Sequence, residues 1–111
     1  MANEFTATDV FGQNVVAKMK TWIEHVIRRH PEMIGQDQKV KEAIETPERV
    51  YQGHTPSHKV FVGRRIQGSG FVFGGKRVVA VIWYDATGRG SLITAYPTAL
   101  DPPGKVLWTR Q

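Results

Sequence analysis

The sequence predicts an α+β fold in which N-terminal helices pack on one face of a twisted antiparallel β-sheet. Apolar residues recur at helical spacing in roughly the first 45 positions, and the rest of the chain is rich in β-branched and aromatic residues interrupted by turn signals. The connections between the expected strands are short, which favours antiparallel neighbours. The chain has 111 residues and no recognisable interdomain linker, so we expect residues 1–111 to form one domain.

Two helices are expected before the strands. Residues 1–12 carry no clear pattern and are expected to be a loose N-terminal segment. A long helix is predicted from about Gln13 to His30, because Pro31 disfavours helical backbone in the residue before it. A shorter helix is predicted from about Asp37 to Glu45 and ends at Thr46-Pro47. The apolar stripe of the long helix consists of Val15, Val16, Met19, Trp22, Ile23, Val26 and Ile27.

Strand-like segments fill the second half of the chain: RVYQ, HKVFVGRR, GFVF, RVVAVIWY, GSLITAY and KVLWTR. Turn signals separate them: GHTPS, QGSG, GGK, DATGRG and TALDPPG. We expect four to six of these strands to form the sheet, with the long helix across one face. VVAVIWY is apolar almost throughout, so it is expected to be a central strand covered on both faces.

Charge is distributed unevenly along the chain. The net charge is +5; residues 1–55 carry seven Lys/Arg and eight Asp/Glu, whereas residues 56–111 carry eight Lys/Arg and only two acids. The positive charge concentrated in the second half is expected to attract a polyanion, most commonly nucleic acid. A basic surface that only aids solubility is the alternative.

Composition limits the reactive groups that the protein can use and indicates where in the cell it acts. The absence of cysteine excludes disulfides, thiolate metal sites and a thiol nucleophile. No apolar run is long enough to span a bilayer, and the N-terminus lacks the layout of a signal peptide. We therefore expect a soluble protein whose site of action is the cytoplasm.

The sequence predicts no metal or cofactor. His54 and His58 have a spacing that could bind zinc, but a catalytic zinc needs three protein ligands. The glycines match neither the phosphate-loop nor the dinucleotide-binding pattern. The two acids of the basic half, Asp85 and Asp101, fall in predicted turns, which argues against a two-carboxylate hydrolase.

Two histidines of the first predicted helix are candidates for acid–base chemistry. His30 follows Val26 by four residues and lies in the middle of the apolar stripe, so a helix lying on the sheet would deliver it to the sheet. His25 lies on the flank of that stripe. The alternative for His30 is a hydrogen-bonded core residue or a residue that stabilises the helix C-terminus.

A row of hydroxyl side chains is expected on the strand LITAYPT. Period-two alternation places Thr94, Tyr96 and Thr98 on one face and Ile93 and Ala95 on the other. The row either lines a site or is an ordinary solvated face. A histidine aimed at hydroxyls and nearby cations provides what cleavage of an RNA phosphodiester requires, because the 2′-OH of RNA is itself the nucleophile.

Five segments in this order carry a resemblance: WIEHVIRRHPEM, VKEAIETPERVYQ, HKVFV, RVVAVIWY and GSLITAYPT. Together they resemble the phage- and toxin-associated branch of the barnase–EndoU–colicin–RelE (BECR) ribonuclease superfamily, over about residues 20–98. Members have an N-terminal helix ending in "H…HPE", a second helix leading to "P…VY" and a core strand with "TAYPT" or a close variant.

The resemblance implies a BECR-like fold and metal-independent cleavage of RNA, often tRNA, by a toxin or effector with a cognate immunity protein or antitoxin. Such a chain is either free-standing or delivered as part of a larger toxin or phage protein. The family's helix histidines fall on His25 and His30, and its strand hydroxyls fall on Thr94 and Tyr96. The candidates for its sheet cation are Lys59 and Arg64. We expect further basic residues to contact the RNA backbone: Arg65, Lys76, Arg77 and Arg89.

Two alternatives remain open at this point. The chain could be a non-catalytic nucleic-acid-binding module on the same fold, or a phage-encoded inhibitor that binds a protein. The inhibitor would use aromatic anchors such as Trp22, Trp83 and Trp108, although Trp22 and Trp83 are expected in the core.

Overall fold

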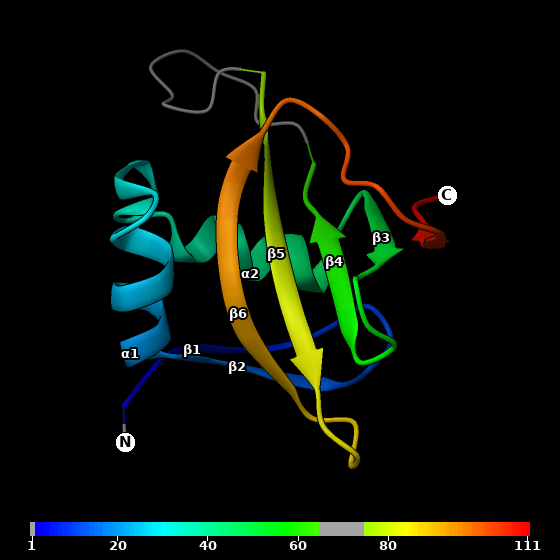
Figure 1. Ribbon diagram of the computed structural model, residues 1–111, viewed down its shortest axis with the longest axis horizontal. Coiled ribbons are helices and arrows are strands. Elements are labelled where there is room, and N and C mark those ends of the chain that lie inside the picture. The colour runs from blue at the N-terminus through cyan, green and yellow to red at the C-terminus, as the bar shows by residue number, and fades with distance from the viewer. Residues whose placement is uncertain (1, 65–74) are drawn as a thin grey trace.

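The computed structural model describes residues 2–64 and 75–111, and its described part is a mixed α+β structure (Figure 1). Its seven-stranded sheet has the order β1-β2-β6-β5-β4-β3-β7. The strands are β1 (Asn3–Thr8), β2 (Asn14–Lys18), β3 (Arg49–Gln52), β4 (His58–Val62), β5 (Arg77–Tyr84), β6 (Gly90–Thr98) and β7 (Val106–Thr109). The helical segments are α1 (Met19–Thr21), the π-helical η1 (Trp22–Ile27), the 3-10 turn η2 (Pro31–Met33) and α2 (Asp37–Glu45). The expected α+β class is confirmed. Five of the six expected strand segments are strands, the sixth, GFVF, lies outside the described residues, and the strands β1 and β2 were not expected.

The N-terminal segment is a β-hairpin, so the expectation of a loose start is wrong. β1 pairs antiparallel with β2 across a turn in which the Asp9 carboxylate accepts the backbone N–H groups of Phe11 and Gln13, at 2.9 and 2.8 Å. Gly12 supplies the positive φ, 86°, that closes the turn. The predicted helix over residues 13–30 is therefore wrong at both ends: residues 14–18 are strand, the helix begins at Met19, and it ends at Ile27, before His30.

The first helix stands beside β6 instead of lying across the sheet (Figure 1). β2 pairs with β6 only through Val15 with Gly90 and Val16 with Ser91, and this pairing is parallel. The expectation of a fully antiparallel sheet is wrong at this one pairing. Beyond these two residue pairs, η1 takes the place of β2 alongside β6. Trp22 and Val26 of η1 are buried in the main hydrophobic core.

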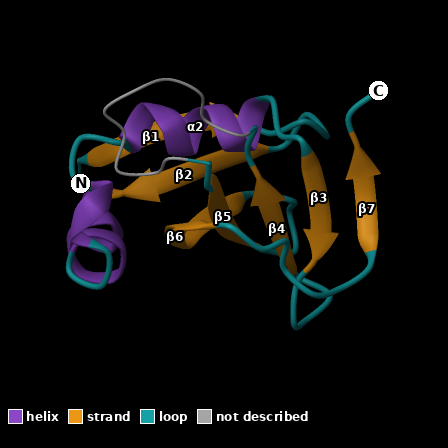
Figure 2. Ribbon diagram, turned by 90° about the horizontal axis from the view of Figure 1, so that it is seen from above, coloured by secondary structure: helices purple, strands orange, loops and turns teal. Residues whose placement is uncertain are grey.

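Helix α2 has the bounds that the sequence predicts, and it covers one face of the sheet (Figure 2). Its buried residues are Val40, Ala43 and Ile44, as expected. They pack with sheet residues such as Phe61 in one continuous core. Burying aliphatic and aromatic side chains of this size stabilises the fold by about 1.5–3 kcal/mol each.

A second face of the sheet lies opposite α2. Tyr51, Val60, Val62 and Val79 are buried there, with Val81 and Tyr96 packed against them. The central strand β5 lies between β4 and β6 and carries buried residues on both faces, as expected. Trp22 is buried, also as expected, but the expectation for Trp83 is wrong, because 40% of its surface is exposed.

Strand β6 contains a β-bulge that changes the expected alternation. Val81 pairs with Thr94 but Ile82 pairs with Leu92, so Ile93 is the additional residue. Leu92 and Ala95 are buried, whereas 41% of Ile93 is exposed, so Ile93 and Ala95 do not share a buried face as expected. Thr94 and Tyr96 remain on the second face, since Thr94 pairs with Val81 and Tyr96 with Val79.

Within residues 2–64 and 75–111, no helix is both long enough and apolar enough to cross a membrane.

Candidate active site

The His30 ring lies against the Tyr96 ring on the second face of the sheet. Their centroids are 5.7 Å apart and their planes are tilted by 34°. The helix that precedes His30 is anchored by Trp22 and Val26 in the main core, and the His30 N–H donates to the Val26 carbonyl at 2.8 Å. The structure therefore brings together two residues that the sequence identifies as candidates, the histidine His30 and the hydroxyl-bearing Tyr96.

A π-helical turn determines which side chains of the first helix are buried. The Arg28 N–H donates to the Ile23 carbonyl at 3.1 Å, a bond that spans five residues instead of four. Trp22 and Val26 are buried, but half of the Ile23 surface and 37% of the Met19 surface are exposed. The expected stripe is thus rotated relative to the core, and His30 follows Val26 by one regular turn.

Tyr96 is half-buried and has an arginine diagonally opposite on the same face. It pairs with Val79, and Arg77 precedes Val79 by two residues and pairs with Thr98. Side chains in this diagonal relation are about 7–8 Å apart at their Cα atoms. The ordinary pKa of tyrosine lies well above neutral pH and burial raises that of Tyr96 further, so its hydroxyl carries a proton and can donate a hydrogen bond.

Thr94 is on the same face as Tyr96, but its hydroxyl has a structural partner. Its Oγ1 donates to the backbone carbonyl of His25 at 3.1 Å, a bond that ties β6 to the first helix. His25 itself is exposed. The structure therefore brings the His25 backbone to Thr94, and His30, not His25, to the Tyr96 ring.

Lys59 lies on the opposite face of the sheet from Tyr96. It pairs with Ile82 of the main core, and its Nζ is 4.4 Å from the centre of the Phe11 ring and 4.7 Å from that of Tyr84. A lysine held between two aromatic rings is a cation–π arrangement. Because successive side chains of a strand alternate between faces, the structure does not bring Lys59 together with His30 and Tyr96.

The remaining candidate cations lie at both ends of the sheet. Arg64 and Lys76 are exposed near the end of the sheet that contains Arg77, and Arg65 lies outside the described residues. Arg89 belongs to the turn between β5 and β6 at the other end. Strand β5 has eight residues, so its two ends are about 23 Å apart at about 3.3 Å per residue. Arg89 is therefore remote from Tyr96.

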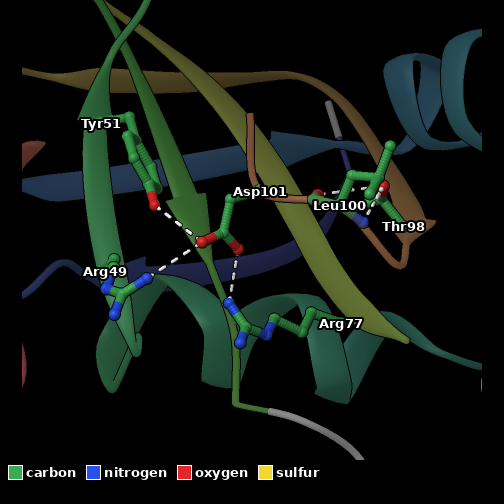
Figure 3. A network of polar contacts seen from close by, with 6 residues as sticks. All are labelled: Arg49, Tyr51, Arg77, Thr98, Leu100 and Asp101. Carbon is green, nitrogen blue, oxygen red and sulfur yellow. Dashed lines mark hydrogen bonds and ion pairs between the residues drawn. The ribbon is translucent and has the colours of Figure 1, made fainter. Parts of the chain in front are cut away.

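A polar network on the second face was missed by the sequence reasoning (Figure 3). The Asp101 carboxylate accepts hydrogen bonds from Arg49 Nη1 at 2.9 Å, from the Tyr51 hydroxyl at 3.1 Å and from Arg77 Nη1 at 2.5 Å. The alternation in RVYQ already places Arg49 and Tyr51 on one face of a strand, which is a signal for two of the three donors. No local pattern indicates that Asp101, 50 residues or more further along the chain, lies beside them.

His54 and His58 form a separate pair at the Trp83 end of the sheet. Their ring centroids are 4.3 Å apart, and the Thr55 hydroxyl is within hydrogen-bonding distance of His58 Nδ1. Burial lowers the pKa of His58, and the nearby His54 lowers it further. Across residues 2–64 and 75–111, no group of three or more potential metal-ligating side chains is gathered.

Replacing His54 with glutamine is expected to raise the pKa of His58, because the neighbouring imidazole no longer opposes protonation. Burial remains, so this pKa stays below the ordinary value of about 6.5. NMR titration of the imidazole protons measures the change, and His25→Gln is the control. An unchanged His58 pKa in the His54 variant would contradict the assigned cause.

The lowered His58 pKa also sets the direction of a pH effect on stability. The unfolded chain binds a proton at His58 at higher pH than the folded chain does. The free energy of unfolding therefore decreases as the pH falls below about 6.5, the ordinary pKa of histidine, toward the lower pKa of His58 in the folded state.

Comparison of the chain with protein-family models, with curated proteins and with solved structures gives no match.

Proposed function

We propose that this protein is a metal-independent endoribonuclease that cleaves RNA, with tRNA as its substrate, through attack of the 2′-OH on the adjacent phosphate. The observation that carries the proposal is the approach of the His30 ring to the Tyr96 ring, 5.7 Å between centroids, on a sheet face that also presents Arg77. The product is a 2′,3′-cyclic phosphate. The resemblance of the sequence to BECR ribonucleases supports the same activity and a BECR-like arrangement of the fold.

Each of these side chains has a chemical role in the proposal. His30 takes the proton of the 2′-OH, since imidazole is the side chain suited to proton transfer near neutral pH. The 2′-oxygen forms a bond to phosphorus, the bond to the 5′-oxygen breaks, and the leaving 5′-oxygen takes up a proton from water. The Tyr96 phenol is protonated at neutral pH and burial raises its pKa further, so its hydroxyl can donate to the phosphate oxygens as negative charge develops.

The cationic residues contact different parts of the RNA in this proposal. Arg77 is the cation assigned to the reacting phosphate, because it is diagonally adjacent to Tyr96. Arg64, Lys76 and His25 are exposed and are assigned to the flanking backbone. Thr94 holds the first helix against β6 and thereby positions His30.

The proposed activity implies partners and a place of action. A nuclease that cuts tRNA acts in the cytoplasm, and the resemblance to toxin-borne ribonucleases implies a cognate immunity protein or antitoxin. The concentration of positive charge in residues 56–111 can attract the phosphates of RNA and equally the acidic surface expected on such a partner.

Incubation of the purified protein with total tRNA in excess EDTA tests the proposal. Cleavage is expected from the wild type and not from a His30→Ala, Tyr96→Ala double variant. Intact tRNA after incubation with folded wild-type protein would contradict the proposal. Binding of tRNA that survives in the double variant while cleavage is absent from both would instead support the nucleic-acid-binding module.

A further inference from the structure

The Asp101 carboxylate occupies a site built from three donors of the second face. Arg49 and Tyr51 come from β3 and Arg77 from β5, and all three donate to the two oxygens of this one carboxylate (Figure 3). Two guanidinium groups and a phenol that converge on one anion form a binding site for a planar or tetrahedral oxyanion. The carboxylate is thus a ligand supplied by the chain itself.

Asp101 reaches this site from the connection between β6 and β7. That connection is fixed at both ends: the Leu100 N–H donates to Thr98 Oγ1 at 3.1 Å, and the Gln52 N–H donates to the Lys105 carbonyl at 2.8 Å. At Gly104, φ is 121° and a Cβ atom would be 2.6 Å from the Gln52 carbonyl oxygen, so only glycine fits there. The connection is anchored at its ends, but most of it is exposed: Pro103 and Gly104 lie at the surface, and 77% of Leu100 is accessible.

The contacts of Asp101 are of a kind that an external anion can replace. The side chains of Arg49 and Asp101 are 41% and 36% exposed, and that of Arg77 is 20% exposed. Of the two ion pairs, the one between Arg49 and Asp101 is exposed on both sides, and exposed pairs contribute little net free energy in water. A phosphodiester carries the same single negative charge as the carboxylate and offers two oxygens to the same donors.

We propose that Arg49, Tyr51 and Arg77 form a phosphate-binding subsite for the RNA backbone, which the Asp101 carboxylate occupies until RNA displaces it. The identity of the anion rests on the proposed ribonuclease function. Arg77 links the two regions, because it donates to Asp101 and is diagonally adjacent to Tyr96. An RNA chain bound at Tyr96 on β6 would therefore run past Arg77 on β5 and reach the donors on β3.

Binding of a fluorescent 2′-O-methyl oligoribonucleotide, measured by anisotropy at several salt concentrations, tests this subsite. The probe retains its phosphates but has no free 2′-OH, so binding is separated from cleavage. Asp101→Asn is compared with Asp85→Asn, which makes the same change of charge in the turn at the other end of β5. Arg49→Gln is compared with Lys39→Gln on α2, on the other side of the sheet.

Asp101→Asn is expected to bind the probe about threefold or more tightly than Asp85→Asn does, because a competing carboxylate is removed from the subsite. Arg49→Gln is expected to bind more weakly than Lys39→Gln, with a salt dependence reduced by about one unit of slope. Equal affinities within each pair would overturn the subsite. If Arg49→Gln does not fold, the comparison of the two aspartate variants decides alone.

The outcomes separate this inference from the proposed function. Probe binding that changes as expected while tRNA stays intact supports the subsite and contradicts the ribonuclease. Cleavage of tRNA by the wild type, with identical probe binding by Asp101→Asn and Asp85→Asn, supports the ribonuclease and overturns the subsite.

Discussion

Replacing His30 with alanine is expected to reduce cleavage of tRNA by about 10²- to 10⁴-fold, the range for loss of a general acid–base group. The substitution removes the only ring that the structure places against Tyr96 among the described residues. It leaves the backbone N–H bond to the Val26 carbonyl available, so the end of the helix can persist. Initial rates with one purified tRNA measure the effect.

His54→Ala is the matched control for His30→Ala. It also removes one imidazole, in this case an exposed one at the Trp83 end of the sheet. Its cleavage rate is expected to stay within about threefold of the wild type. Equal losses in the two variants, or an unaffected His30→Ala variant, would contradict the assignment of His30.

Replacing Asp9 with alanine is expected to destabilise the fold by about 2–4 kcal/mol, because it removes the acceptor of several buried or partly buried donors. Asp9 is 4% exposed, and its carboxylate accepts the N–H groups of Phe11 and Gln13 and the Tyr84 hydroxyl at 2.5 Å. The Tyr84 hydroxyl loses its acceptor in a buried position. Urea denaturation monitored by tryptophan fluorescence measures the free energy of unfolding.

Asp85→Ala is a closely matched comparison for Asp9→Ala. The Asp85 carboxylate accepts the N–H groups of residues two and four positions later, Thr87 and Arg89, just as Asp9 does in its own turn. Asp85 lies at the surface and has no buried tyrosine as a partner, so its replacement is expected to cost clearly less. Equal destabilisation by the two substitutions would show that the buried bond to Tyr84 contributes nothing.

The two aspartate turns also explain why the first β-hairpin was missed. DVFGQ at residues 9–13 and DATGR at residues 85–89 fold into the same turn, with a glycine at φ 86° in the fourth position of each. DATGR was identified as a turn because strand-like residues flank it on both sides. DVFGQ precedes apolar residues that also fit a helix, and period 3.6 and period 2 cannot be separated over so few residues.

Local pattern was sufficient for α2 and for the central strand β5. The spacing of Val40, Ala43 and Ile44 matches one helical face only, and a proline ends the helix. The first helix was harder to predict because its π-helical turn changes the angle between successive residues. Ile23 is half-exposed for this reason, and no sequence signal indicates it.

Some residues of the candidate site could be predicted from the sequence and others could not, and the alternation of side chains along a strand explains part of this difference. His30 and Tyr96 are brought together because the helix ends beside β6. Lys59 is excluded from this face by its register opposite Ile82, and the sequence could not show this, because HKVFV has apolar residues on both faces of the strand. Asp101 could not have been placed, because its partners are distant in sequence and its connection to β7 is irregular.

Analysis of the fragment ends produced from tRNA in EDTA tests the central claim most directly. The account predicts fragments that end in a 2′,3′-cyclic phosphate, with a 5′-hydroxyl on the neighbouring fragment, from the wild type but not from the His30→Ala, Tyr96→Ala double variant. Mass spectrometry distinguishes these ends. Fragments that end in a 3′-hydroxyl, or cleavage that persists in the double variant, would contradict the account.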